Sequence, residues 1–318
     1  MILSSALIAY TLAESVALTL GIVAGYGAWN ITRHYRADYS ARSYRLYALS
    51  ELSGALIRFL LLAKLLLFFY YIFLLDSYTT KLIGAMCATG VVGAIKGGWW
   101  LFVWKILVLL LGVIWLFMHH DDLKSEQEPY FRKKFLFYLP ILGALLVEFI
   151  WSLYALFSLE PQRLVSCCAT VFSPQSFQKS GAILDKTPLF ALFFSLFIVL
   201  LSSYKRHSAG LFVGNALFLA ATLWAIIYFF SPYIYALPTH VCPFCLLQKE
   251  YYGVGYLIYA LLFWGSFLGC AAAARLIYAP KLSSDTIIRL SLALYALVLC
   301  ILFGYVIGYF LINGTWLG

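Results

Sequence analysis

The sequence has little charge. Only 11% of its 318 residues are Asp, Glu, Lys or Arg, whereas 64% are hydrophobic and the mean hydropathy is +0.92. Soluble globular domains are about a quarter charged. The shortage of charge therefore excludes a soluble protein and predicts an integral membrane protein whose first partner is the lipid bilayer. The net charge of +9 is then expected to report orientation in the membrane, and we expect no nucleic-acid partner.

Histidine is also scarce. The five histidines lie in loops or near the ends of the apolar stretches, and no Cys-x-x-Cys-His motif is present. A b-type haem inside the bilayer needs histidine ligands within the spans, and a c-type haem needs that motif. The sequence therefore argues against haem as a cofactor.

The first apolar stretch has no basic segment in front of it and is too long for a signal peptide, so we expect it to remain as the first span. A stretch of about 20 apolar residues crosses a bilayer as a helix. Eight segments meet this criterion, at about 3–29, 48–75, 98–118, 135–158, 187–204, 208–231, 251–274 and 286–312. The sequence thus predicts an all-α, polytopic, eight-span protein.

The remaining segments are short. The stretch 82–97 is apolar but glycine-rich and too brief to span, so we expect a re-entrant or surface segment. The longest connection is 159–186. With no internal repeat and no soluble domain evident, residues 1–318 are expected to form one membrane domain with a small cap on its outer face.

Lysine and arginine placement predicts the topology. The loops near residues 30–47, 119–134, 205–207 and 275–289 carry about twice as many basic residues as the alternate loops, and the richer set is cytoplasmic by the positive-inside rule. Both termini then lie outside. We expect a bacterial inner membrane, with the outer loops in the periplasm.

Four ionisable residues fall inside predicted spans at similar depth: Glu14, Lys64, Lys105 and Glu148. Charges in the bilayer are costly, by about 2.5–3.5 kcal/mol on insertion scales, and usually face the interior of the bundle. Two acids and two bases at one depth predict paired charges, for example Glu14 with Lys64 and Glu148 with Lys105. They would fix helix register or form part of a proton path.

The predicted topology places five of the seven cysteines on the outer face. Cys270 and Cys300 fall within spans and are expected to be inert. The other five are Cys87, Cys167, Cys168, Cys242 and Cys245. Thiols that face an oxidising compartment form disulfides or take part in redox reactions.

Cys242 and Cys245 form a Cys-Pro-Phe-Cys motif at the predicted start of the seventh span. The amide groups and dipole of a helix N-terminus there would stabilise a thiolate at Cys242, and Pro243 is well tolerated in a first helical turn. In a dithiol mechanism Cys242 would attack and Cys245 would resolve. Cys-x-x-Cys also binds metals, so His240, Cys242 and Cys245 are candidate ligands.

The stretch HVCPFCLLQKEYYG (240–253) resembles two membrane families, the disulfide bond formation protein B family and the vitamin K epoxide reductase family. Both are four-helix bundles with a Cys-x-x-Cys at the outer end of a span beside a quinone. The resemblance implies that Cys242 and Cys245 are a redox pair beside a quinone and that they exchange disulfides with a loop cysteine pair. A periplasmic thiol protein is a candidate partner. Cys167 and Cys168 would supply the loop pair. They are adjacent rather than separated, so a bridge from Cys87 to Cys167 or Cys168 would be geometrically easier.

Three functions therefore stay open. The preferred one is a membrane thiol–disulfide oxidoreductase on the outer face, coupled to a quinone in electron transport. A second is a non-enzymatic subunit of a larger respiratory or transport complex, with structural disulfides and other membrane subunits as partners. A third is a metal- or cluster-binding membrane protein.

Overall fold

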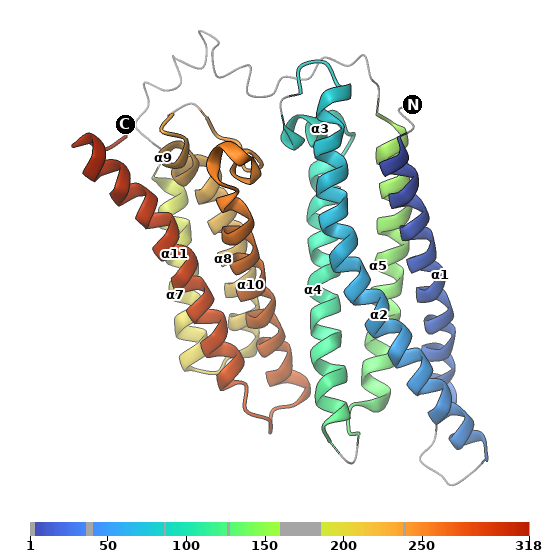
Figure 1. Cartoon of the computed structure of the whole chain (residues 1–318). Helices are drawn as coiled ribbons and strands as arrows, with labels where there is room; N and C mark the ends of the chain where they lie inside the picture. The colour runs from blue at the N-terminus through green and yellow to red at the C-terminus, as the bar shows by residue number, and fades with distance from the viewer. Residues whose placement is uncertain are drawn as a thin grey trace. The chain divides into compact units, whose positions relative to one another are not determined.

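The computed structural model of the protein describes residues 4–35, 41–85, 87–125, 128–159, 186–237 and 240–317. Every regular element within these ranges is helical (Figure 1). Eight of the helices are long and apolar enough to cross a membrane. The predicted all-α, eight-span membrane protein is therefore confirmed.

Four of the spans belong to the first of two compact units. They are α1 (Ser5–His34), α2 (Ala41–Ser77), α4 (Gly98–Leu123) and α5 (Phe131–Phe157). Both α1 and α4 contact α2, and both also contact α5. The four helices therefore form a closed arrangement in which α1 lies opposite α4 and α2 lies opposite α5.

The other four spans belong to the second unit. They are α7 (Thr187–Tyr204), α8 (Ser208–Ala225), α10 (Val254–Tyr278) and α11 (Asp285–Asn313). α8 continues through a π-helical turn, Ile226–Phe230, into the short helix α9 (Ser231–Tyr235). Pro232 follows the π-helical turn and has no N–H to donate to the carbonyl four residues earlier, which accounts for the irregular turn at this point. The segment Gly84–Thr89 also belongs to unit 2.

The observed helices extend several predicted spans. The prediction at 48–75 corresponds to Ala41–Ser77, and the prediction at 251–274 corresponds to Val254–Tyr278. The stretch 82–97 contains only the seven-residue helix α3 (Ala88–Ala94), which at 1.5 Å per residue is far too short to span. Most of the predicted outer loop 159–186 lies outside the described residues. One membrane domain stays a prediction, since two four-span units can form one domain or two.

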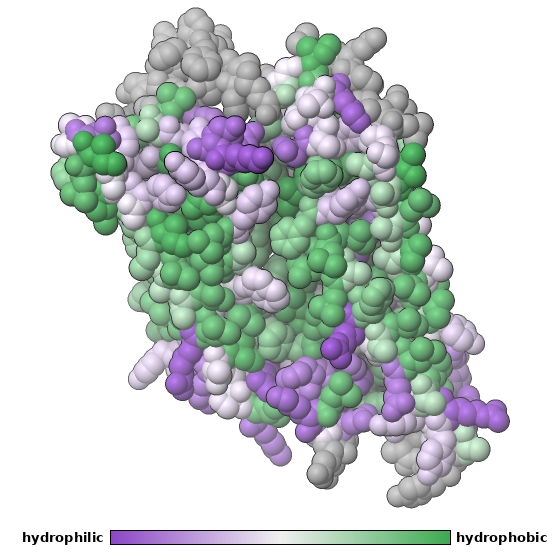
Figure 2. Space-filling model, in the orientation of Figure 1, coloured by the Kyte–Doolittle hydropathy of each residue, from purple (hydrophilic) through white to green (hydrophobic). Residues whose placement is uncertain are grey.

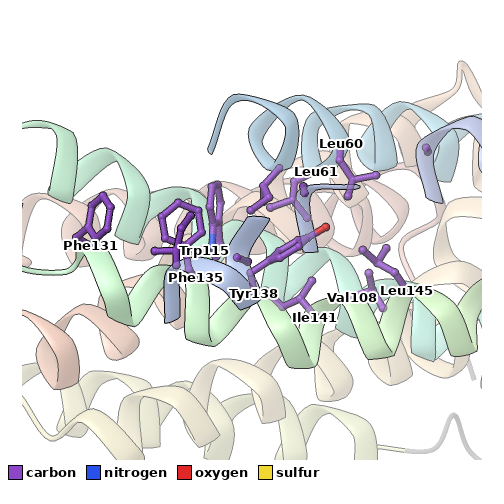
Figure 3. Packing of buried hydrophobic residues seen from close by; sticks show 14 residues of the cluster. Leu60, Leu61, Val108, Trp115, Phe131, Phe135, Tyr138, Ile141 and Leu145 are labelled. Carbon is purple, nitrogen blue, oxygen red and sulfur yellow. The ribbon is translucent and has the colours of Figure 1, made fainter. Parts of the chain in front are cut away.

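The core of unit 1 is built from aliphatic and aromatic side chains on α1, α2, α4 and α5 (Figure 3). Glycine allows these helices to approach closely. A Cβ at Gly25 of α1 would lie 2.3 Å from a methyl of Leu142, and one at Gly27 would lie 2.0 Å from the Ser53 hydroxyl. Small residues at helix crossings are the usual means of close packing in membranes.

Polar side chains join three helices inside unit 2. The Tyr295 hydroxyl of α11 donates to Asn215 Oδ1 of α8 at 2.6 Å and lies 3.2 Å from the Ser266 hydroxyl of α10. Gly269 makes room for Asn215, since a Cβ there would lie 1.9 Å from Asn215 Oδ1. These buried groups find partners within the protein, as the bilayer interior requires.

The outward faces of the spans are apolar. On the face shown in Figure 2, hydrophobic residues cover most of the middle of the helices, and hydrophilic residues gather toward the helix ends. Leu66 is 70% exposed and Phe190 is 74% exposed, which would be unfavourable in water. In a bilayer these side chains contact lipid.

Candidate functional site

Three of the predicted site cysteines meet in unit 2. The sulfur atoms of Cys87, Cys242 and Cys245 all lie within 4.8 Å of one another, and all three side chains are buried. The Cys87 and Cys242 sulfurs are 3.3 Å apart, which is contact distance rather than the ~2.05 Å of a disulfide bond. We refer to these residues as the three-cysteine cluster.

The loop that carries Cys242 and Cys245 is not the start of the long helix. α10 begins at Val254, and Cys245 begins a single 3₁₀ turn, Cys245–Leu247. The expectation that the α10 dipole acts on Cys242 and that Pro243 lies in the first turn of α10 is therefore wrong. The backbone explains the difference, because Tyr252 and Gly253 both have positive φ, at 55° and 60°, and this left-handed conformation interrupts a helix.

Gly255 lets this loop fold back onto the first turn of α10. A Cβ at Gly255 would lie 2.8 Å from Leu246 Cβ and 2.9 Å from the Leu246 carbonyl carbon. Leu246 is fully buried and directly follows Cys245. Close backbone contact at this glycine thus holds the second cysteine of the motif in place.

Two tyrosines hold the loop from the flanking helices. The Tyr235 hydroxyl at the end of α9 donates to the Cys242 carbonyl at 2.5 Å. The Tyr259 hydroxyl in α10 donates to the Pro243 carbonyl at 2.7 Å. The Cys242 carbonyl is buried and the Pro243 carbonyl is partly buried, and carbonyls removed from water need such partners. The sequence offered no means of selecting these two from 24 tyrosines.

A hydroxyl group lies against the central thiol. Thr89 Oγ1 is 3.1 Å from Cys242 Sγ, and Thr89 is the second residue of α3. A hydroxyl that donates to sulfur stabilises the thiolate, which is the nucleophilic form of cysteine. Thr89, which the sequence did not indicate, is therefore within reach to stabilise a Cys242 thiolate in place of the α10 N-terminus.

Within the described part of the chain, the other cysteines and the histidine considered in the sequence do not join the three-cysteine cluster. His240 packs against the Tyr235 ring, with centroids 4.2 Å apart. Among the described residues, Cys87 rather than His240 completes the group of three ligand atoms that could hold a metal ion. Cys167 and Cys168 lie outside the described residues. Cys270 is buried in α10, with its sulfur 4.0 Å from the Phe212 carbonyl.

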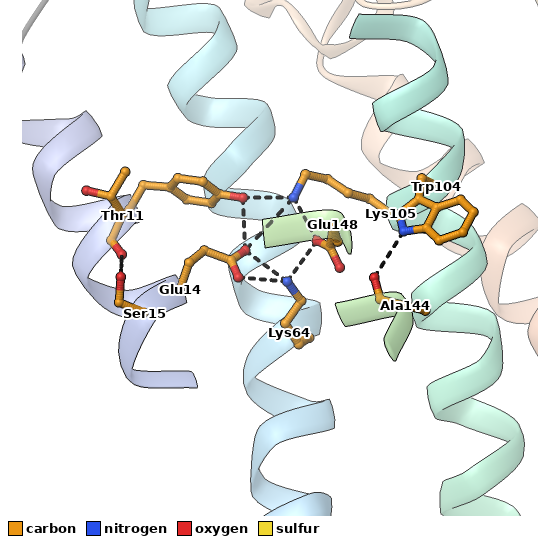
Figure 4. Close-up of polar contacts among 9 residues, drawn as sticks. Thr11, Glu14, Ser15, Lys64, Trp104, Lys105, Ala144 and Glu148 are labelled. Carbon is orange, nitrogen blue, oxygen red and sulfur yellow. Dashed lines mark hydrogen bonds and ion pairs between the residues drawn. The ribbon is translucent and has the colours of Figure 1, made fainter. Parts of the chain in front are cut away.

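A second set of predicted residues meets inside unit 1 (Figure 4). Glu14 of α1, Lys64 of α2, Lys105 of α4 and Glu148 of α5 are all buried, and we refer to them as the charge ring. Lys64 Nζ lies 2.8 Å from carboxylate oxygens of both Glu14 and Glu148, and Lys105 Nζ lies 2.7 Å from Glu148. Each span contributes one charge.

The ring connects helices that are not neighbours. The Lys64–Glu148 contact joins α2 to the opposite helix α5, and it was not predicted. Tyr10 adds a further link, because its hydroxyl donates to Glu14 at 2.9 Å and accepts from Lys105 at 2.9 Å. Buried charges are tolerated only when they are well paired. These contacts give each charge an opposite partner and fix the register of four helices, whereas a proton path through the ring stays a prediction.

Comparison with known proteins does not assign the chain to a family. It matches no protein-family model, no curated protein and no solved structure. The features that bear on function are therefore the geometry of the three-cysteine cluster and the local resemblance of residues 240–253.

Proposed function

We propose that the protein is a membrane thiol–disulfide oxidoreductase whose reactive group is the three-cysteine cluster. The observation that carries this proposal is the 3.3 Å distance between the Cys87 and Cys242 sulfurs, with Cys245 in the same group. Thiol–disulfide exchange requires a thiolate to reach one sulfur of a disulfide. At this spacing, a disulfide can move between the Cys242–Cys245 pair and the Cys87–Cys242 pair without a large movement of the chain.

In the exchange reaction, the electrons that the substrate gains come from Cys242 and Cys245. The Cys242 thiolate attacks a substrate disulfide, forms a mixed disulfide and releases one substrate thiolate. The Cys245 thiolate then attacks the Cys242 sulfur and releases the second substrate thiolate. The substrate has gained two electrons, and its two thiolates take up two protons from water. The Cys242–Cys245 disulfide that remains has lost two electrons. All steps are reversible, so the same residues can instead oxidise a substrate dithiol.

Cys87 provides a relay between disulfides. Its thiolate attacks the Cys242 sulfur of the Cys242–Cys245 bond, forms a Cys87–Cys242 bond and leaves Cys245 as a thiolate. No electrons leave the protein in this step. A complete cycle needs a two-electron, two-proton partner, and a quinone in the bilayer is the chemical class that we propose. After the protein disulfide has oxidised a substrate dithiol, the quinone accepts two electrons and two protons from the cysteine pair and restores its disulfide. In the opposite direction, the quinol supplies the two electrons and two protons.

The four spans of unit 2 support the proposal. The local resemblance is to families with four-helix bundles, and unit 2 contains four spans and the whole three-cysteine cluster. The chain has four spans more than the bundles of these families. The additional spans are those of unit 1, which does not carry the motif. By the distribution of basic residues, we further propose that the cluster faces the periplasm of a bacterial inner membrane, with both termini outside and a periplasmic thiol protein as partner.

Metal binding is the second candidate function. Three cysteine sulfurs within 4.8 Å could supply a trigonal thiolate site for Cu(I), or three of the four ligands of zinc. The two functions differ in what the cluster needs. Exchange needs an alternation between thiol and disulfide, whereas a resident metal would hold all three thiolates together.

The proposal is tested with single cysteine variants of the full chain. Oxidation of dithiothreitol by a short-chain quinone, followed by absorbance, provides the assay. We expect Cys242→Ser and Cys245→Ser to abolish this activity while the proteins remain folded by size-exclusion chromatography. Cys270→Ser, which alters a buried cysteine of the same unit, should retain it. Equal loss of folded protein in both motif variants would support structural disulfides in a non-enzymatic subunit, and full activity in both would overturn the proposal.

A further inference from the structure

A cavity of about 720 Å³ lies where α1 ends and α5 begins. It is independent of the cysteines, since both helices belong to unit 1. Its volume is in the range of ligand pockets, about 300–1,000 Å³. The lining combines cations with apolar side chains: Trp29, Thr32, Arg33, Pro129, Arg132, Lys133, Leu136 and Leu139.

Three cations line this cavity. Arg33, Arg132 and Lys133 form no ion pair with any carboxylate among the described residues. The neighbouring Lys134 provides a contrast, because it is buried and lies 2.6 Å from Asp122. Glu128, the nearest described acid along the chain, accepts a hydrogen bond from Tyr47 at 2.8 Å. The cavity thus carries positive charge that its described walls do not neutralise.

Two of the cations are held in position. Arg132 Nε donates to the Thr32 carbonyl at 3.0 Å, which ties its guanidinium to the end of α1. The Arg33 guanidinium lies 6.0 Å from the centroid of the Trp29 ring. Arg132 and Lys133 also lie in the first turn of α5, where the helix dipole favours an anion.

The apolar side of the cavity distinguishes a lipid from a soluble anion. Leu136 and Trp29 are 59% and 52% exposed, and Leu139 lines the same cavity one turn further along α5. These residues continue toward the middle of the spans. A ligand that fits both parts has an anionic head and hydrocarbon chains.

We propose that this cavity binds the headgroup of an anionic phospholipid. Its phosphodiester contacts Arg33, Arg132 and Lys133, and its acyl chains lie along Leu136 and Leu139. Basic pockets between membrane helices bind anionic headgroups by this chemistry. The single negative charge of the phosphodiester offsets part of the positive charge that these three residues place at the end of the α1–α5 pair.

The test compares lipid binding in the full chain and two double variants. The protein is transferred to a neutral detergent and titrated with phosphatidylglycerol or phosphatidylcholine, and bound lipid is counted by native mass spectrometry. Arg33→Gln with Lys133→Gln removes two cations and spares the Arg132–Thr32 contact. Lys205→Gln with Lys281→Gln removes the same charge from exposed positions in unit 2 and is the matched control.

We expect phosphatidylglycerol to bind in preference to phosphatidylcholine. The Arg33/Lys133 double variant should weaken phosphatidylglycerol binding by about 10- to 30-fold, since each basic residue near a membrane surface contributes roughly fivefold. The control should bind as the unaltered protein does. Equal binding by both double variants would overturn the proposal.

Two further measurements keep the result decisive. Leu139→Phe fills the apolar side without changing charge, and it should weaken phosphatidylglycerol binding even if the charge variant does not fold. Inorganic phosphate, added to the protein with phosphatidylglycerol bound, tests whether a soluble anion occupies the same site. If phosphate at equal concentration displaces bound phosphatidylglycerol, the cavity is a soluble-anion site and the lipid proposal fails.

Discussion

The sulfur atoms of Cys87 and Cys242 lie 3.3 Å apart although 155 positions separate them in the chain. Cys87 belongs to a segment that precedes α3, and Cys242 lies in the loop between α9 and α10. Both are buried within unit 2. This contact adds a third thiol to a Cys-x-x-Cys motif of low specificity, and the proposed relay between disulfides depends on that third thiol.

The close contact at Gly255 should be essential for the position of Cys245. Gly255→Ala places a Cβ 2.8–2.9 Å from Leu246, and we expect a loss of about 1–3 kcal/mol in unfolding free energy together with reduced oxidoreductase activity. Gly304→Ala is the control, because no atom lies within 4 Å of a Cβ at that position. Unfolding in mixed micelles measures the difference. Equal stability of the two variants would show that the loop does not pack as described.

The hydroxyl of Tyr259 should contribute to activity through the loop backbone. Tyr259→Phe leaves the partly buried Pro243 carbonyl without its partner, at a cost of about 0.5–1.5 kcal/mol, the usual net contribution of one hydrogen bond. We expect slower thiol exchange with an unchanged number of titratable thiols. Tyr252→Phe removes the same hydroxyl from a side chain that is 97% exposed, so it should behave as the unaltered protein. A normal exchange rate in Tyr259→Phe would exclude the positioning role.

Removal of one acid from the charge ring should destabilise the protein strongly. Glu148→Gln leaves Lys64 and Lys105 with only one carboxylate between them, and breaking a buried ion pair costs about 3–5 kcal/mol. Glu51→Gln makes the same chemical change at an exposed position of α2 and should change stability by less than about 0.5 kcal/mol. The measurement is the unfolding free energy in mixed micelles. Similar values for the two variants would mean that the ring does not hold the helices together.

Chelation separates redox chemistry from metal binding at the cysteines. If the cluster exchanges disulfides, dialysis of the reduced protein against a strong chelator should leave its activity and thermal stability unchanged. Elemental analysis should then find less than one equivalent of zinc or copper. A stoichiometric metal whose removal lowers stability would favour the trigonal thiolate site instead.

The sequence predicted the spans because bilayer thickness imposes a simple rule on apolar length. It also placed Glu14, Lys64, Lys105 and Glu148 at one depth, since position along a helix follows from residue number. It could not predict the Lys64–Glu148 contact, because which helices lie opposite each other depends on packing between distant segments.

Less of the three-cysteine cluster and its surroundings could be predicted from the sequence. The Cys-x-x-Cys motif identified Cys242 and Cys245, but hydrophobicity alone placed the helix start too early. The left-handed conformation of Tyr252, a non-glycine residue, gave no local signal. The roles of Thr89, Tyr235 and Tyr259 depend on contacts between segments, so they became visible only in the folded chain.

The Cys245→Ser variant provides the most direct test of the cluster as one exchanging unit. With Cys245 removed, mild oxidation of the purified protein should join Cys242 to Cys87, and mass spectrometry of the digested protein should identify that cross-linked peptide pair. Dithiothreitol should release both thiols again. If Cys242 instead remains unpaired after oxidation, or pairs with a cysteine other than Cys87, the proposed exchange between these sulfurs is contradicted.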